Sequence, residues 1–91
     1  MNYQWDPVKA DLNWKKHGVD FADAVGVFED DRALTLKEEV VPGEQRLATV
    51  GMDFLGRVLI VVYTYRGENI RIISARPGTK TEKGTYDERR I

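Results

Sequence analysis

Four arginines in the second half of the sequence have the most distinctive chemistry. They fall at or near the ends of predicted strands and are Arg46, Arg66, Arg71 and Arg76. A guanidinium group suits phosphate because its planar fork donates two hydrogen bonds at once and stays charged. The alternative is a structural role, in which the arginines are solvated or are paired with nearby carboxylates. Those carboxylates are Glu44, Glu68 and Glu82.

The faces on which these arginines lie depend on the parity of each strand. Successive side chains of a strand point to opposite faces. Parity therefore predicts Arg76 on the face of Ile70 and Ile72, and Arg71 on the other face with Ile73. Arg66 ends the preceding strand, and the register between the two strands decides which of these faces Arg66 shares.

His17 is the only histidine, and it is the natural candidate for proton transfer because histidine titrates near neutral pH. The neighbouring Lys16 can bind phosphate as a point charge. The alternative for His17 is a helix cap, since it precedes Gly18 and a cation there favours the helix dipole.

Two further pairs can place a proton-transfer group beside a partner. Glu44 and Arg46 are two residues apart, so they share a face of an extended chain. They can act as a base and a phosphate clamp, or form an ion pair worth ~1 kcal/mol or less if exposed. Glu82 and Tyr86 are one helical turn apart. Tyr86 can donate a proton or stack on a base, or it can simply cover the sheet.

Composition narrows the class of protein. With one histidine and no cysteine, the usual zinc sites are excluded, and no phosphate-binding glycine loop is present. We expect no metal and no cofactor. No apolar run approaches the ~20 residues of a membrane span and no signal pattern opens the chain, so a cytoplasmic protein is expected.

The charge is divided unevenly between the two halves. Residues 1–45 carry five Lys or Arg against ten Asp or Glu, a net charge of −5. Residues 46–91 carry nine against five, a net charge of +4, so the whole chain has −1. Such asymmetry points to an anionic partner for the basic half, although scattered solvated charge is an equally good reading.

Two helices are predicted in the first 31 residues. Asp6 and Pro7 are typical of a helix start, and Gly18 is typical of a helix end. Asp20 caps a second helix, which ends at Glu29-Asp30-Asp31. Its apolar stripe is Phe21, Ala24, Val25 and Phe28.

Four strands joined by short turns follow, and a helix ends the chain. The strands are predicted at 33–36, 46–52, 58–63 and 70–76. Since the third strand is apolar on both faces, Leu59, Val61 and Ile73 are expected in the core. Thr79 and Glu82 form a capping box for a helix from 79 to about 90. The order predicts one α+β domain over residues 1–91, with two N-terminal helices, a four-stranded antiparallel sheet and a short C-terminal helix.

Short segments along nearly the whole chain resemble the BrnT family of toxins. They are Trp5-Asp6-Pro7, Lys9-Ala10, Asn13, 16–19, Phe21, Ala24, Val27-Phe28, Asp30, 44–46, Gly51, 61–66, 71–76, Glu82 and Tyr86. The resemblance implies a RelE-like fold, toxicity through RNA cleavage, and an antitoxin. That antitoxin would be BrnA-like, with a ribbon-helix-helix part, in a complex that regulates its own transcription. It alone would contact operator DNA.

A ribonuclease without a metal needs a base for the ribose 2′-hydroxyl, an acid for the leaving 5′-oxygen and cations for the charge between them. The predicted catalytic residues are His17, Glu44, Arg66, Arg76 and Tyr86. The predicted RNA-phosphate ligands are Lys16, Arg46 and Arg71. Which residue is base and which is acid stays open.

Two other functions compete with an RNA-cleaving toxin that inhibits translation. One is a non-catalytic subunit that only holds a protein or nucleic acid. The other is a stand-alone RNA-binding domain. If the chain is a toxin, exposed arginines predict an antitoxin that lies directly over Arg66 and Arg76.

Overall fold

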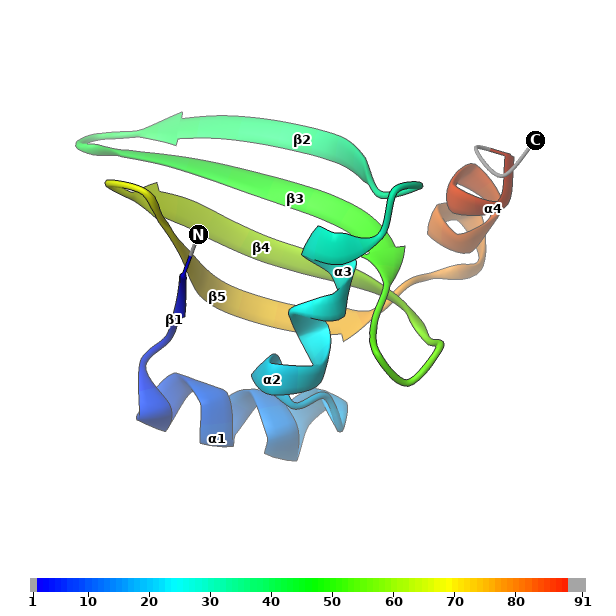
Figure 1. The fold of residues 1–91 in the computed structure, drawn as a ribbon, viewed down its shortest axis with the longest axis horizontal. Coiled ribbons are helices and arrows are strands. Elements are labelled where there is room, and N and C mark those ends of the chain that lie inside the picture. The colour runs from blue at the N-terminus through cyan, green and yellow to red at the C-terminus, as the bar shows by residue number, and fades with distance from the viewer. Residues whose placement is uncertain (1, 89–91) are drawn as a thin grey trace.

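The computed structural model describes residues 2–88 as a mixed five-stranded sheet with helices on both faces (Figure 1). The elements are β1 (Tyr3–Gln4), α1 (Pro7–His17), α2 (Phe21–Ala24), α3 (Gly26–Glu29), β2 (Leu34–Val41), β3 (Glu44–Met52), β4 (Val58–Arg66), β5 (Asn69–Pro77) and α4 (Lys80–Glu88). The strand order is β1-β5-β4-β3-β2. The α+β class is confirmed. The expected end of the last helix near residue 90 lies outside the described residues.

The sheet differs in two ways from the predicted four antiparallel strands. It has one additional short parallel strand, and β2 continues to Val41 instead of ending at residue 36. In β1, Tyr3 pairs with Ile70 and Gln4 with Arg71. A two-residue strand is too short to show the alternation by which strands are recognised in a sequence. The other pairings are antiparallel, as predicted.

The first helix is as predicted, but the second is divided. The Asp6 side chain caps α1, and Gly18 ends it with φ 67°. The predicted second helix breaks between α2 and α3, where the backbone N–H of Phe54 donates to the carbonyl of Asp23 at 3.2 Å. Gly26 lies against this segment, and a Cβ there would be only 2.5 Å from the Phe54 nitrogen. Close backbone packing thus replaces a continuous helix.

A β-bulge in β5 corrects the predicted faces of its arginines. Val62 pairs with Ser74 and Tyr63 with Ile72, so Ile73 is the extra residue of the bulge. Beyond it the parity is reversed. Arg71 and Arg76 therefore share one face, instead of lying on opposite faces.

The same bulge changes which residues are buried. Leu59 and Val61 are fully buried, as predicted, whereas Ile73 is only half-buried. The main core lies between the sheet and the α2–α3 side. It consists of Val19, Phe21, Ala24, Val27, Leu59, Val61, Tyr63, Ile70, Ile72 and Ala75.

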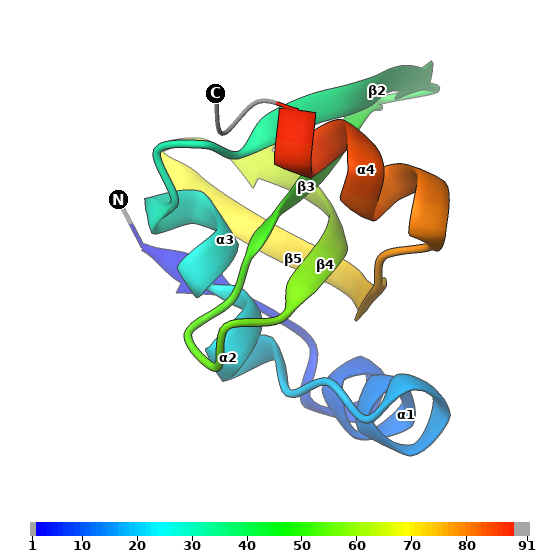
Figure 2. The ribbon, with the colours of Figure 1, turned by 90° about the vertical axis from the view of Figure 1, so that its right-hand side faces the viewer.

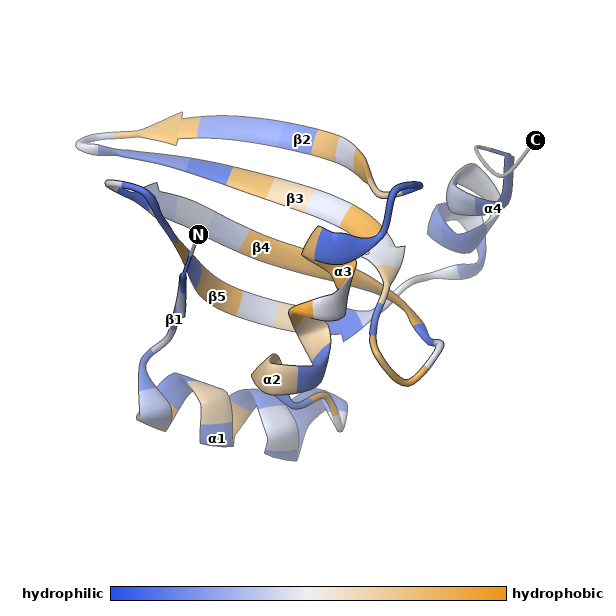
Figure 3. Cartoon of the chain, in the orientation of Figure 1, coloured by the Kyte–Doolittle hydropathy of each residue, from blue (hydrophilic) through white to orange (hydrophobic). Residues whose placement is uncertain are grey.

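The opposite face of the sheet is covered only at one end. There α4 places Tyr86 against Val50 and Ile60 in a second, smaller core. Figure 2 shows α4 on this side of the sheet, with α2 and α3 on the other and α1 beyond β5. No helix within residues 2–88 covers the remainder of this face, and the middle of β2 and the first part of β3 are hydrophilic (Figure 3).

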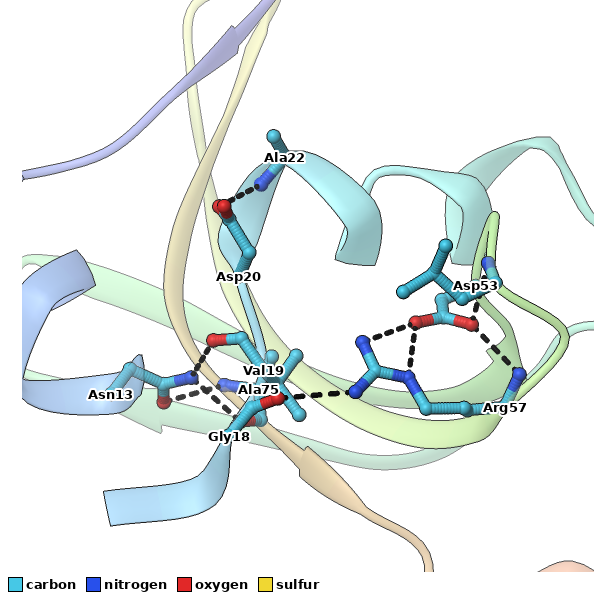
Figure 4. A network of polar contacts seen from close by, with 9 residues as sticks. Asn13, Gly18, Val19, Asp20, Ala22, Asp53, Arg57 and Ala75 are labelled. Atoms are coloured by element: carbon cyan, nitrogen blue, oxygen red, sulfur yellow. Dashed lines mark hydrogen bonds and ion pairs between the residues drawn. The ribbon is translucent and has the colours of Figure 1, made fainter. Parts of the chain in front are cut away.

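A polar network attaches α1 to the free edge of β5 (Figure 4). The buried Asn13 amide donates to the carbonyls of Ala75 and Val19 at 2.8 and 3.0 Å, and it accepts from the Ala75 N–H at 3.1 Å. Nearby, Arg57 joins Asp53 at 2.8 Å and the Gly18 carbonyl at 3.1 Å. These contacts fix the position of α1 relative to the sheet.

Candidate functional site

The uncovered part of the α4 side of the sheet carries a row of basic residues. We call it the open face, and it comprises Arg46, Ala48, Val62, Thr64, Arg66, Arg71 and Ser74. Thr64 pairs with Arg46 on one side and with Arg71 on the other. Thr64 itself is only 2% exposed, and since adjacent strands are about 5 Å apart, Arg46 and Arg71 flank it on its two sides. Arg66 lies two residues further along the same face.

Glu44 lies among these cations. Its Oε2 accepts a hydrogen bond from Arg46 Nε at 2.7 Å. This bond lowers the pKa of Glu44 from its ordinary value, and the charges of Arg66 and Lys9 add to the effect. A carboxylate ionised at neutral pH is therefore surrounded by cations from β3, β4 and α1. A hollow of about 410 Å³ adjoins it, lined by Gly43, Glu44, Gln45, Thr64, Tyr65 and Arg66.

Two of the arginines keep their charge available for a ligand. Within residues 2–88, neither Arg66 nor Arg71 has a carboxylate within 4.0 Å. Arg66 is exposed and Arg71 is half-buried. A purely structural role in an ion pair is therefore excluded for Arg66 and Arg71 within these residues. Arg46 does form an ion pair, with Glu44, but through its Nε alone.

Arg76 is separated from this group by its own partner. Its Nη1 and Nη2 contact the two carboxylate oxygens of Glu82 at 2.7 and 3.0 Å. The bidentate pair lowers the pKa of Glu82 to about 2, and hydrogen bonds from Thr79 add to this. As the capping box predicted, the Glu82 carboxylate and the Thr79 hydroxyl exchange bonds with each other's backbone N–H groups. Arg76 thus binds the first turn of α4 to the sheet.

Tyr86 is likewise engaged in holding α4. It is 2% exposed, and its hydroxyl donates to Asp30 Oδ2 at 2.7 Å. The same carboxylate accepts from the backbone N–H groups of Met52 and Arg32. Burial raises the pKa of Asp30, but the bonds from Tyr86, Met52 and Arg32 outweigh it, and the pKa is lowered. Asp30 therefore remains a charged anchor for the helix.

His17 and Lys16 lie away from Glu44, on α1. They line a groove of about 200 Å³, here called the α1–β5 groove, with Lys9, Leu12, Asn13, Ile73 and Ser74. Lys9 and His17 are eight residues apart, which is about 12 Å along a helix. The structure thus gathers Glu44, Arg46, Arg66 and Arg71, and it places His17 and Lys16 along the neighbouring helix.

Sequence reasoning missed Lys9 as a site residue. The sequence feature that could have identified Lys9 is its spacing of seven residues from Lys16, which places both lysines on one side of a helix. Thr64 was missed because only the strand register puts it between two arginines.

Two further observations concern metal binding and membrane insertion over the described residues. The structure gathers no cluster of three or more Asp, Glu or His side chains suited to a metal ion in residues 2–88. Over the same residues, no helical segment has both the length and the apolar character that crossing a bilayer demands.

Comparisons with known proteins agree with the arrangement of these elements. Residues 5–82 match the family model for the ribonuclease toxin, BrnT, of type II toxin-antitoxin systems. The chain is also similar to the crystal structure of the Brucella abortus ribonuclease toxin, BrnT. The two are 26% identical with a TM-score of 0.70, over 88% of this chain and 99% of that one. A search of curated proteins found no significant match.

Proposed function

The chain belongs to the BrnT family of ribonuclease toxins of type II toxin-antitoxin systems, and from this premise we propose that it cuts single-stranded RNA at the open face and so inhibits translation. The observation that carries this proposal is the convergence of Arg46, Arg66 and Arg71 around one patch of sheet beside an ionised Glu44. Such a patch fits a backbone phosphate with a ribose hydroxyl next to it.

The arginines supply the electrostatic part of the reaction. Attack of the 2′-oxygen on phosphorus adds negative charge to the phosphate oxygens. Arg66 and Arg71, which have no carboxylate partner within residues 2–88, offer their charge to those oxygens. In this proposal the two guanidinium groups stabilise the developing charge more than they stabilise the bound substrate, and this difference accelerates the reaction.

Glu44 is the base in this proposal, in a RelE-like reaction without a metal. Its carboxylate takes the proton of the 2′-hydroxyl as the oxygen bonds to phosphorus and the bond to the 5′-oxygen breaks. The products are a 2′,3′-cyclic phosphate and a 5′-hydroxyl end. The low pKa of Glu44 keeps it ionised, and Arg46 orients it.

The leaving 5′-oxygen requires a proton from another group. Guanidinium groups keep their protons, so the arginines do not provide it. We assign this step to a water molecule, because His17, the histidine predicted for proton transfer, lies away from Glu44 in the α1–β5 groove. Arg76 and Tyr86 are given no step in this scheme, because both anchor α4 at the other end of this face, against Val50 and Ile60.

The partner that we propose is a BrnA-like ribbon-helix-helix antitoxin. Acidic side chains of the antitoxin would lie over the open face at Arg66 and Arg71, which have no carboxylate partner within the described residues. Arg76, which was also expected beneath the antitoxin, is already paired with Glu82. Complementary charge steers such an encounter and fixes its orientation. Operator DNA would be bound only through the antitoxin. RNA and antitoxin should therefore compete, and simultaneous binding without loss of either affinity would contradict occlusion.

The test is cleavage of single-stranded RNA in the presence of a chelator. Arg66→Ala and Arg71→Ala should each lower kcat by roughly 10²-fold, as removal of one oxyanion ligand does. Glu44→Gln should lose a similar factor. Arg32→Ala, an exposed arginine of the α3–β2 connection, serves as the control.

Three results of this test would be informative. Loss of activity in chelator would contradict the metal-free mechanism. Full activity of the arginine variants would contradict the proposed site. RNA binding without any cleavage would favour the non-catalytic subunit.

A further inference from the structure

The α1–β5 groove is a second surface with the character of an anion site. Lys9, Leu12 and Lys16 recur at intervals of three and four residues, so they form one stripe of α1. The opposite wall is Ile73 and Ser74 of β5. The groove therefore has a basic helix on one side and a strand of the open face on the other.

The lysines of the groove have charge to offer. Lys9 and Lys16 are exposed, and within residues 2–88 neither has a carboxylate within 4.0 Å. Lys15 differs, since its Nζ pairs with Asp11 at 2.8 Å. Lys9 also acts on Glu44, whose pKa it helps to lower. Lys9 therefore lies in the groove and also acts on the carboxylate next to the open face.

The walls between these lysines are apolar and have little capacity to read a base edge. Leu12 is 59% exposed, and Ile73 is partly turned out of the core by the bulge. The Asn13 amide uses both of its N–H groups on backbone carbonyls. Only the Ser74 hydroxyl lacks a hydrogen-bond partner among the described groove residues that carry a hydroxyl or amide. A flat ring can therefore lie against Leu12 and Ile73, and Ser74 and His17 are the lining residues that can bond its edge.

We propose that the α1–β5 groove binds a nucleotide of single-stranded RNA that flanks the cleaved bond. Its phosphates contact Lys9 and Lys16, and its base lies against Leu12 and Ile73. The spacing of seven residues between the lysines spans about 10 Å along α1, which suits two phosphates of an extended strand. This inference rests on the proposed ribonuclease function, and it predicts that substrates too short to reach the groove bind less well.

The experiment measures the affinity of non-cleavable 2′-O-methyl RNA of graded length by fluorescence anisotropy at several salt concentrations. Wild type should gain affinity as the RNA lengthens to reach the groove. Lys9→Ala and Lys16→Ala should each lose most of that gain, roughly tenfold for long RNA. Each should also reduce the log–log salt slope by about 0.7. Lys15→Ala is the matched control and should behave as wild type.

Two outcomes would overturn the subsite. One is that the Lys9 and Lys16 variants match Lys15→Ala in affinity and slope while Arg66→Ala still loses cleavage, which leaves the proposed function intact. The other is that the same variants retain RNA affinity but bind a ribbon-helix-helix antitoxin more weakly, which makes the groove a protein-binding surface. If wild type neither binds nor cleaves RNA, the proposed function fails together with the subsite.

Discussion

Two arginine–glutamate pairs on the same side of the sheet have different surroundings. Arg46 binds Glu44 through one bond at 2.7 Å, and two further cations face that carboxylate. Arg76 binds Glu82 through two bonds, and Glu82 in turn caps its own helix. The first pair leaves an excess of positive charge, which suits a ligand. The second pair is closed on itself, which suits a structural role.

Replacement of Glu82 tests that structural role through pH. The pKa of Glu82 is about 2 in the folded chain, below its ordinary value of 4.5. Its contribution to stability is therefore present above pH 4.5 and is lost as the pH falls toward 2. Glu82→Gln should lower the free energy of unfolding by about 1 kcal/mol at neutral pH, a modest value because the Arg76 side chain is 39% exposed.

Urea unfolding at a series of pH values measures this effect. The gap between wild type and Glu82→Gln should narrow as the medium is acidified, and the exposed Glu88→Gln should show no such gap. A gap that stays constant down to pH 2 would show that the charge of Glu82 is not what stabilises α4.

Tyr86→Phe tests the other anchor of α4. Loss of the hydroxyl removes a bond to the charged Asp30, so the free energy of unfolding should fall by about 1–2 kcal/mol. A double-mutant cycle with Asp30→Asn should show a coupling of about 1 kcal/mol between the two residues. Additive effects in that cycle would argue that the hydroxyl serves something other than this contact.

At this scale the sequence indicated residue types better than roles. The affinity of arginine for phosphate and the capping box at Thr79 follow from chemistry that holds in any surroundings. The partners of Arg76 and Tyr86 do not, because they depend on how α4 docks across the sheet. Asp30 is 56 residues from Tyr86, and no local pattern connects them.

At the scale of elements, small irregularities decide which residues meet. One extra residue at Ile73 puts Arg71 and Arg76 on one face and turns Ile73 toward α1. Bulges leave no periodic trace in an apolar strand, so parity alone gave the wrong faces. The break before Gly26 was also hidden, because its cause is the approach of Phe54 from another loop. Helix starts and strand turns, which depend on neighbouring residues, were predictable.

Asn13 is the element-scale contact with the largest expected effect. Asn13→Ala leaves backbone groups of Ala75 and Val19 without partners in a buried place, so the free energy of unfolding should fall by about 2 kcal/mol. Asn13→Asp keeps the size but loses both donors and should cost at least as much. The exposed Asn2→Ala should change stability by less than about 0.5 kcal/mol. Thermal and urea unfolding measure all three, and an Asn13→Ala variant as stable as Asn2→Ala would refute the contact.

At the scale of the whole molecule, one face of the sheet holds the main core and the other carries the basic residues of the proposed site. The α2–α3 side is packed against the larger hydrophobic cluster, while the α4 side has a smaller cluster at one end and basic residues beyond it. The positive charge of the second half of the sequence is thereby concentrated although the net charge is −1. This explains why overall charge alone is a poor guide to an anionic ligand.

Val61→Ala tests how much stability the main core provides. Val61 is fully buried in β4, so the lost methyl groups and the resulting cavity should cost roughly 1–3 kcal/mol. A chain of 91 residues has about 5–13 kcal/mol in total, so this loss is large. The matched control is Val40→Ala in β2, where the side chain is 79% exposed and the change should be below about 0.5 kcal/mol. Equal melting temperatures of the two variants would show that the core is elsewhere.

The Asn13 amide has a consequence for how molecules of this protein meet one another. By occupying both backbone groups of Ala75, it acts as a one-residue substitute for a neighbouring strand. β1 pairs only with Ile70 and Arg71 of β5, and Asn13 prevents another chain from adding a strand further along that edge, at Ala75. At the opposite edge, β2 relies on a bulge after Thr35 and on the charges of 37–39. A variant that loses the Asn13 amide would thus expose an apolar strand edge to intermolecular pairing, and its aggregation in the cell would exceed what its loss of folding stability alone predicts.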